Sequence, residues 1–231
     1  MKLHILIPVV CIFSLSQGLA QFRKKPLVNL ENFDKQRVHW GYFLGINQYD
    51  FKFDYYENTG DILVDKTIGF NVGLIGNLRI NDYVDIRLEP GLYFTKRNMN
   101  FPGFAAQSDA LRGVKSTYIY LPLLVKANAK RLGNFKPYVV GGASLSMNLS
   151  SNENNPNDNS AGTFRMQYTT YYYEIGFGVD LYLYYFKLSP SIRAVFALND
   201  EVVPDDDLLS PWTSNLKGLF SRAVFLNFTF E

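Results

Sequence analysis

Eight charged residues could carry acid–base chemistry. Each of them lies in a segment where charged or polar residues alternate regularly with apolar ones. Four are carboxylates and four are bases: Asp85, Glu89, Glu174 and Asp180, and Arg87, Lys126, Lys187 and Arg193. Two carboxylates at one site could serve as general acid and base, or the set could relay protons. Opposite charges can instead pair, and each then offsets the cost of burying the other. We expect the second arrangement and no catalytic residue, with an ion-pair network of Asp85, Arg87, Glu89, Lys126, Glu174, Asp180 and Arg193.

Few other residues could bind a metal or assist a nucleophile. His39 is the one histidine after residue 20, so a histidine-dependent triad or metal site would need it. A hydrogen bond at the rim of a lumen is the plainer expectation for this side chain. Asp205, Asp206 and Asp207 could bind calcium, but they lack the spaced acidic and glycine pattern of a dedicated loop. We expect a solvated acidic loop there, no metal site and no cofactor.

The elements that must position these charges are β-strands. After Val38, apolar residues at positions 40, 42, 44 and 46 alternate with small or polar ones, which is the period of two of a strand. The apolar set then moves to positions 49, 51, 53 and 55, which predicts a β-bulge near Asn47 or Gln48. Similar alternation predicts further strands at residues 67–80, 84–94, 118–128, 139–149, 171–183, 187–198 and 223–230.

The connections between these segments predict the topology. Short turns near residues 81, 133 and 184 alternate with long segments near 56–66, 96–115, 150–167 and 199–217. Outer-membrane barrels have an even number of strands, short turns in the periplasm and long loops outside. The sequence therefore predicts an all-β fold, an eight-stranded antiparallel transmembrane β-barrel with both termini in the periplasm. Residues 150–162 form a low-complexity loop that cannot bury a core.

The distribution of charge favours a membrane barrel over a soluble one such as a lipocalin. The apolar faces extend over about 10 residues and carry almost no charge, as lipid-facing strands must. The eight charges lie on the opposite face, which would be a lumen filled by its own side chains. Aromatic residues make up 16% of the chain although its mean hydropathy is only −0.08, as alternating strands with aromatic girdles produce. We expect outer-membrane lipid around the barrel and no protein passing through it.

The N-terminus and the composition bear on the domain boundaries, on disulfide bonds and on nucleic acid as a partner. Residues 1–20 have the basic start, apolar run and small-residue end of a signal peptide. Residues 21–37 then form an N-terminal extension and residues 38–231 the barrel. Removal of the signal peptide deletes Cys11, the only cysteine, so no disulfide is expected. The 23 basic and 21 acidic residues are nearly balanced and scattered, which argues against nucleic acid as a partner.

The start of the predicted barrel carries a family resemblance. NLENFDK at residues 29–35, VHWGYFLG at 38–45 and DFK at 50–52 resemble the PorT family of Bacteroidota. A similarity in general strand pattern continues to the terminal Phe228, Thr229 and Phe230, although these later motifs are generic barrel sequence. Glu231 departs from the usual barrel ending, which has an aromatic residue at the last position.

The resemblance implies an outer-membrane component of the type IX secretion system, which is tied to gliding motility and to export of proteins with C-terminal sorting domains. Because a filled bore cannot pass cargo, we expect a non-catalytic accessory role beside a larger translocon or periplasmic components. The expected partner-binding residues are Asn29, Leu30, Phe33, Asp34 and Lys35. The alternatives are a stand-alone surface barrel acting in adhesion or envelope integrity through its long loops, and a lumen-rim hydrolase that uses His39.

Overall fold

In the part of the chain that the structure describes, ten β-segments form a single sheet, and a short 3-10 helix precedes it. The computed structural model describes residues 27–57, 60–104, 106, 110–151, 153, 164–205, 207 and 210–231, so the predicted signal peptide and most of the 150–162 loop lie outside the described residues. In the described part, no helix is both long and apolar enough to cross a membrane. The elements are η2 (Phe33–Lys35), β1 (Val38–Tyr55), β2 (Leu63–Lys66), β3 (Ile68–Arg79), β4 (Val84–Leu88), β5 (Gly91–Asn100), β6 (Leu111–Asn128), β7 (Phe135–Asn148), β8 (Thr169–Tyr182), β9 (Lys187–Ala197) and β10 (Leu216–Phe230).

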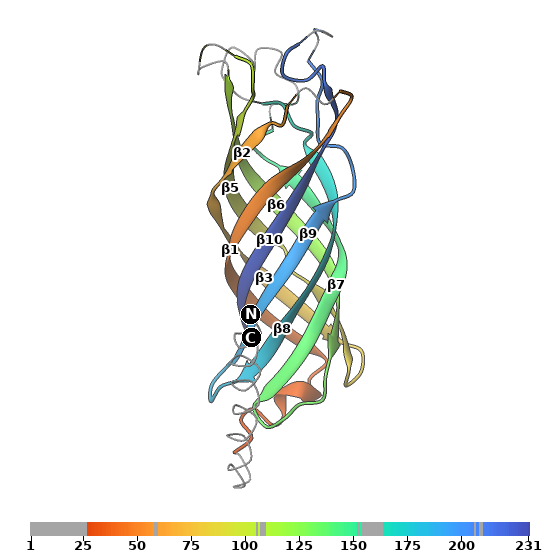
Figure 1. Ribbon diagram of the computed structural model, residues 1–231. Coiled ribbons are helices and arrows are strands. Elements are labelled where there is room, and N and C mark those ends of the chain that lie inside the picture. The colour runs from red at the N-terminus through yellow and green to blue at the C-terminus, as the bar shows by residue number, and fades with distance from the viewer. Residues whose placement is uncertain are drawn as a thin grey trace, which may run out of the picture.

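The sheet closes into a barrel of eight antiparallel strands (Figure 1). β1 pairs with β10 on one side and with β3 on the other, so the first strand joins the last. Only Thr67 separates β2 from β3, and these two segments make up the second strand. Glu89 and Pro90 separate β4 from β5, which make up the third; a proline has no N–H to donate to the ladder. The strand number and the antiparallel order are those predicted.

The two ends of the barrel differ in their connections. The end that we call the turn end, at the bottom of Figure 1, carries tight turns at residues 80–83, 129–134 and 183–186, close to the predicted positions. In the first turn, the Asn81 side chain accepts hydrogen bonds from the backbone N–H groups of Tyr83 and Val84, both at 2.8 Å. In the second, Gly133 has a φ of +62°, which glycine adopts without steric cost. The opposite end, the loop end, carries the longer connections.

The strands continue farther toward the loop end than predicted. β5 extends to Asn100 and β6 begins at Leu111, so half of the loop expected at residues 96–115 is strand. β2 likewise occupies part of the loop expected at 56–66, and β10 begins at Leu216. The predicted strand ends were wrong because many outward-facing residues near the loop end are polar. The apolar alternation that marks a lipid-facing strand is therefore lost there.

The expected β-bulge near Asn47 or Gln48 is also wrong. β1 keeps one register with β10 from residue 42 to residue 53, and the irregularity lies between Asp54 and Tyr55. Odd-numbered side chains point inward along this whole stretch. The apolar residues change parity because toward the loop end the bore becomes apolar while the outer face becomes polar, at Gln48, Asp50 and Lys52. A change of surroundings, and not of register, produces the pattern.

Three layers of side chains fill the bore. Charged side chains occupy the part near the turn end. The middle layer is aromatic and contains Phe43, Tyr49, Tyr93, Tyr118, Tyr120, Tyr172 and Phe225, with Ile75 and Val195 beside them. The layer at the loop end is apolar and includes Phe51, Met99, Phe101, Phe164, Met166 and Leu219. The bore of an eight-stranded barrel is about as wide as its own side chains, so these layers are enough to occupy it.

Candidate functional site

A continuous series of ion pairs crosses the bore near the turn end. Arg193 lies 2.7 Å from Glu89 and 3.1 Å from Glu174. Arg87 lies 3.4 Å from the same Glu89 and 2.7 Å from Glu231. Arg87 comes from β4, Glu174 from β8 and Arg193 from β9, whereas Glu89 and Glu231 directly follow β4 and β10. The series therefore links walls that are far apart in the sequence.

Two lysines extend the series. Lys187 of β9 lies 2.8 Å from Glu231 and 3.9 Å from Asp180 of β8. Lys126 of β6 lies 2.6 Å from Asp180. We call this set the lumen network; its members are Arg87, Glu89, Lys126, Glu174, Asp180, Lys187, Arg193 and Glu231.

The lumen network is balanced in charge and closed to solvent. It holds four carboxylates and four cations, and each of its side chains is at most 5% exposed. Buried charges cost several kcal/mol each unless partners replace their water. Every member here has such a partner within 3.4 Å. The arrangement accounts for a charged filling of the bore and leaves no carboxylate of the set unpaired to act as a base.

Glu231 is a member of the network that the sequence analysis missed. It was noted only as a departure from the usual aromatic ending, yet its carboxylate contacts both Arg87 and Lys187. The available signal was parity: residues 223, 225, 227 and 229 of β10 all face inward, so residue 231 continues that row. The last residue of the chain therefore ties β10 to the lumen network.

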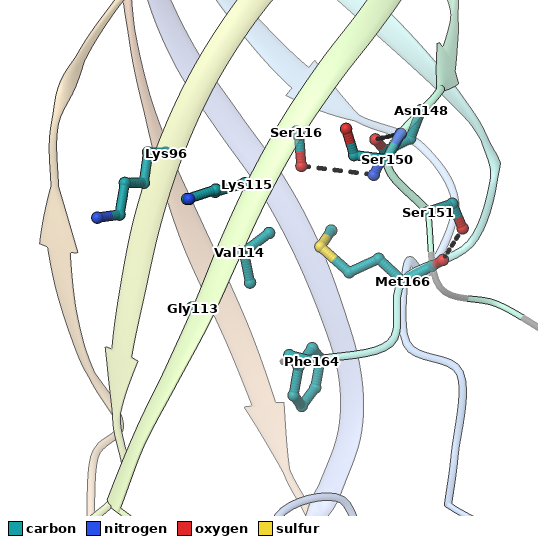
Figure 2. A pocket seen from close by; sticks show the side chains of 10 residues that line it. All are labelled: Lys96, Gly113, Val114, Lys115, Ser116, Asn148, Ser150, Ser151, Phe164 and Met166. Carbon is teal, nitrogen blue, oxygen red and sulfur yellow. Dashed lines mark hydrogen bonds between the residues drawn. The ribbon is translucent and has the colours of Figure 1, made fainter. Parts of the chain in front are cut away.

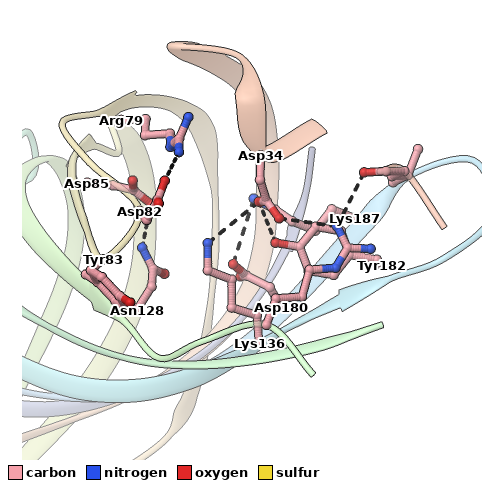
Figure 3. A network of polar contacts seen from close by, with 12 residues as sticks. Asp34, Arg79, Asp82, Tyr83, Asp85, Asn128, Lys136, Asp180, Tyr182 and Lys187 are labelled. Carbon is pink, nitrogen blue, oxygen red and sulfur yellow. Dashed lines mark hydrogen bonds and ion pairs between the residues drawn. The ribbon is translucent and has the colours of Figure 1, made fainter. Parts of the chain in front are cut away.

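Asp85 differs from the other predicted network residues. Its carboxylate accepts a hydrogen bond from the Asn128 side chain at 2.9 Å, as Figure 3 shows, and it has no ion-pair partner among the described residues. Lys126, which is its direct cross-strand neighbour, reaches Asp180 instead. The expected ion pair at Asp85 is thus replaced by an amide contact.

Another buried cation, outside the lumen network and also missed, lies in the layers toward the loop end. Arg97 is fully buried, and it donates hydrogen bonds to Ser221 at 3.0 Å and to the Tyr118 hydroxyl at 2.8 Å. Its guanidinium lies 3.9 Å from the centre of the Phe51 ring, a cation–π contact. Glu201, from the connection between β9 and β10, accepts from the same Ser221 hydroxyl at 2.9 Å. These polar contacts therefore attach the aromatic layer to the surrounding strands.

The catalytic alternatives find little support in this geometry. The His39 ring stacks on Phe33 with 4.3 Å between centroids, and in the described part of the chain no hydrogen bond joins it to a hydroxyl group. No three His, Cys, Asp or Glu side chains gather as a metal site among the described residues. The solvated acidic loop was wrong for Asp205, which is buried and lies 3.0 Å from Arg165. Asp206 lies outside the described residues.

The segment before β1 is held against the turn end. We call residues 27–36 the turn-end segment. The Asn29 backbone N–H donates to the Asn134 side chain at 2.8 Å, and the Asn29 side chain donates to the Tyr182 carbonyl at 3.0 Å. Arg131 donates to the carbonyl of Leu30 at 3.3 Å and also to that of Asn29. The segment is thereby fixed to the turn between β6 and β7 and to the end of β8.

Asp34 forms the main polar contact of this segment (Figure 3). It accepts a hydrogen bond from the Tyr182 hydroxyl at 2.6 Å. Arg131 lies 3.2 Å and Lys136 3.7 Å from its carboxylate. The Arg131 guanidinium also lies over the Tyr182 ring, 3.5 Å from its centre. One carboxylate thus joins η2 to three side chains of the barrel.

Phe33 covers the mouth of the bore. Besides stacking on His39, its ring lies 4.7 Å from the Lys187 ammonium of the lumen network. Of the five predicted partner-binding residues, Asn29, Phe33 and Asp34 are therefore used within the chain, and Leu30 is half-buried. Lys35 remains exposed, and so do Glu31 and Asn32. Within residues 29–35, these are the three exposed side chains that the segment offers to another molecule.

Acid should loosen the turn-end segment. Burial alone would raise the pKa of Asp34, but the Tyr182 hydrogen bond and the cations Lys136 and Arg131 outweigh it and hold the pKa below its usual value. A carboxyl whose pKa is lowered by folding stabilises the folded state above its unfolded pKa, about 3.9, and this stabilisation is lost as pH falls through the folded value. We expect the amides of residues 29–35 to exchange hydrogen faster below about pH 4, after correction for intrinsic rates.

The matched variant is Asp34→Asn, which removes the charge at every pH. It should exchange fast at neutral pH and show no further acid-induced change in this segment. Equal exchange in the wild type and Asp34→Asn at neutral pH would show that the carboxylate does not hold the segment.

The outer wall of the barrel carries a belt of exposed apolar side chains. Leu74, Ile175 and Phe177 are 64%, 63% and 65% exposed, far more than large apolar residues in a water-soluble core. Aromatic residues border the belt at both ends: Trp40, Tyr42, Tyr184, Tyr185 and Phe186 at the turn end, and Phe70, Phe94, Tyr171 and Tyr173 toward the loop end. An apolar surface this large marks contact with a membrane or partner, and paired aromatic girdles are typical of membrane barrels.

The sequence matches one protein family, and several solved structures are similar to the chain. The family described as "Outer membrane protein beta-barrel domain" matches residues 19–203, most of the chain. Among solved structures, neisserial surface protein A is 12% identical with a TM-score of 0.47, and the alignment covers 84% of this chain and 98% of that one. OprG of Pseudomonas aeruginosa is 15% identical with a TM-score of 0.45, covering 84% and 93%. Ail of Yersinia pestis, in complex with the heparin analogue sucrose octasulfate, is 13% identical with a TM-score of 0.39, covering 84% and 99%.

No curated protein matches the sequence. The family match spans the strands whose outward side chains form the apolar belt, from β1 to β9. The chain therefore belongs to the outer membrane protein β-barrel domain family, and its belt is the surface that contacts the lipid of the outer membrane.

Proposed function

We propose that the chain is a non-catalytic accessory component of a type IX protein secretion system, which binds or scaffolds a larger translocon in the outer membrane. Outer-membrane barrels place their short turns in the periplasm, so the turn end and both termini would lie there. The proposal takes up the resemblance of residues 29–35 and 38–45 to the PorT family. Because the bore is filled, the barrel would serve secretion through its surface.

The observation that carries the proposal is the ordered turn-end segment. Asn29, Phe33 and Asp34 attach it to the barrel, while Glu31, Asn32 and Lys35 point to solvent. A segment already held in one conformation binds with a smaller loss of conformational entropy than a free extension. Residues that resemble the family motif thus build a fixed polar surface at the mouth of a closed barrel.

The proposal predicts that exchanging two exposed charges stops export. Glu31→Arg combined with Lys35→Glu keeps the net charge and leaves the contacts of Asn29, Phe33 and Asp34 in place. Cells carrying this variant should retain the barrel in the outer membrane but fail to secrete proteins with C-terminal sorting domains. Secretion and barrel abundance are measured together, by immunoblots of culture medium and membranes.

The matched control exchanges two opposite charges elsewhere at the same end, the ion pair of Arg79 and Asp82. Arg79→Asp combined with Asp82→Arg alters the turn after β3 with the same net charge. Secretion should persist in this control. Normal secretion in the Glu31→Arg, Lys35→Glu variant would contradict docking through the turn-end segment.

A stand-alone surface barrel is the second candidate, and one feature favours it. An apolar cluster that includes Phe51, Met99, Phe164 and Leu219 lies beneath the loops and gives them a firm base. If adhesion or envelope integrity depends on these loops, replacing the described loop residues 101–104 and 210–215 would abolish function. The charge exchange at the turn-end segment would then have no effect.

A further inference from the structure

Two lysines face each other on the outer wall toward the loop end. Lys96 of β5 and Lys115 of β6 are direct cross-strand partners, and both are exposed. Figure 2 shows them side by side on adjacent strands, away from Asn148 and Met166. Cβ atoms of such partners lie about 4.5–5.5 Å apart, and like charges placed opposite one another destabilise the sheet. An anion between the two ammonium groups would offset this repulsion.

Neighbouring basic residues on the same wall are paired, in contrast to these two. Lys52 lies 3.2 Å from Asp54, whereas Lys66 and Arg222 lie 2.9 and 2.8 Å from Asp50. Among the described residues, no carboxylate forms an ion pair with Lys96 or Lys115. The local charge therefore remains uncompensated by the chain itself.

An apolar hollow of about 620 Å³ adjoins the two lysines on the belt side. Its lining includes Ile46, Ile68, Phe70 and Phe94, with Thr67 beside the lysines. The rings of Phe70 and Phe94 stack with 5.7 Å between centroids and 7° between planes, which gives the hollow a flat wall. These apolar side chains belong to the lipid-facing belt, so the hollow opens toward hydrocarbon at one end and toward the charged boundary at the other.

We propose that this hollow is a binding site for one phosphate-bearing lipid of the membrane leaflet at the loop end. The phosphate lies between the ammonium groups of Lys96 and Lys115, and an acyl chain lies along Ile68, Phe70 and Phe94. Lysine binds phosphate as a compact point charge, and the hollow supplies the apolar surface that an acyl chain needs. The site depends on membrane insertion and not on the secretion role.

The test uses the purified full-length barrel in detergent and native mass spectrometry. The probes are diphosphorylated lipid A, the same lipid with its phosphates removed, and inorganic pyrophosphate as a phosphate source without chains. The wild type should retain one diphosphorylated lipid A and bind neither other probe appreciably. Lys96→Gln combined with Lys115→Gln should weaken this binding about thirtyfold, since each basic residue at an anionic membrane surface contributes about fivefold.

The control is Lys217→Gln, which removes an exposed lysine from β10 at the same end of the barrel but outside the hollow. It should bind the lipid like the wild type, and all variants should show the same folded fraction by mobility without heating. Undiminished binding by the double variant, or equal loss in Lys217→Gln, would overturn the site. Equal binding of the dephosphorylated lipid would exclude recognition of phosphate, and equal binding of pyrophosphate would make it a site for free phosphate instead.

Discussion

Arg193→Ala is expected to lower the free energy of unfolding by about 3–5 kcal/mol, the usual cost of removing one partner from a buried ion pair. Arg193 is the sole ion-pair partner of Glu174 and one of two partners of Glu89 among the described residues. Its loss leaves the buried carboxylate of Glu174 without an ion-pair partner and leaves Glu89 with Arg87 alone. Urea unfolding of the barrel in lipid vesicles measures the change. Trp40, which is 76% exposed on the belt, reports insertion by its fluorescence.

The control for this prediction removes the charges together. Arg193→Met combined with Glu174→Gln removes one charge of each sign and leaves Glu89 paired with Arg87, and replacing a whole buried ion pair is often nearly neutral. This variant should therefore lose much less stability than Arg193→Ala. Equal losses in the two variants would mean that packing, and not charge compensation, explains the role of Arg193.

Leu74→Arg is expected to destabilise the inserted barrel by about 2–4 kcal/mol, the cost of a cationic side chain near the middle of the bilayer. Leu74 lies on β3 within the belt and is 64% exposed, so the new side chain clashes with nothing in the barrel. In a water-soluble barrel the same change would be close to neutral, because an exposed leucine has little packing to lose. The same vesicle-based unfolding measurement applies.

Gln48→Arg is the matched control for depth. Gln48 is exposed on β1 at the level where the outer face becomes polar. An arginine near the membrane boundary costs only about 0–1 kcal/mol. Similar effects at positions 48 and 74 would contradict the placement of the belt in the hydrocarbon layer.

Much of the fold could be predicted because one physical rule governs each strand. Lipid outside and a filled bore inside impose strict alternation, so residues 67–80 and 171–183 were recognised as strands from their pattern alone. The rule fails where the surroundings change. Toward the loop end the outer face meets water, so β5 and β6 continue beyond the predicted ends, and the parity change in β1 imitates a bulge without being one.

Most residues of the lumen network could be predicted from the sequence, but not which of them form ion pairs. Parity placed Arg87, Glu89, Lys126, Glu174, Asp180 and Arg193 in the bore, where they meet. Which charges pair depends on reach across strands distant in sequence, so Asp85 was expected to pair and instead binds Asn128. Glu231 and Arg97 were overlooked although their parity was readable. The folding of residues 29–35 onto the turn end was not readable, since it rests on contacts with Arg131, Lys136 and Tyr182.

These contacts change the interpretation of the motif at residues 29–35, which was expected to bind a partner. Three of its side chains hold the segment to the barrel, and the remaining ones form the exposed surface. If the proposed secretion role holds, a barrel with a filled bore would serve it through this exposed surface. It presents a fixed polar surface beside the membrane.

The most direct test of this account is a native pull-down of the tagged protein from detergent-solubilised outer membranes, comparing the wild type with the Glu31→Arg, Lys35→Glu variant. The account predicts that the wild type recovers a very large translocon barrel and that the variant recovers only itself, although both are folded and equally abundant. Recovery of the barrel alone in both cases, or of the translocon in both, would contradict a docking role for the turn-end segment.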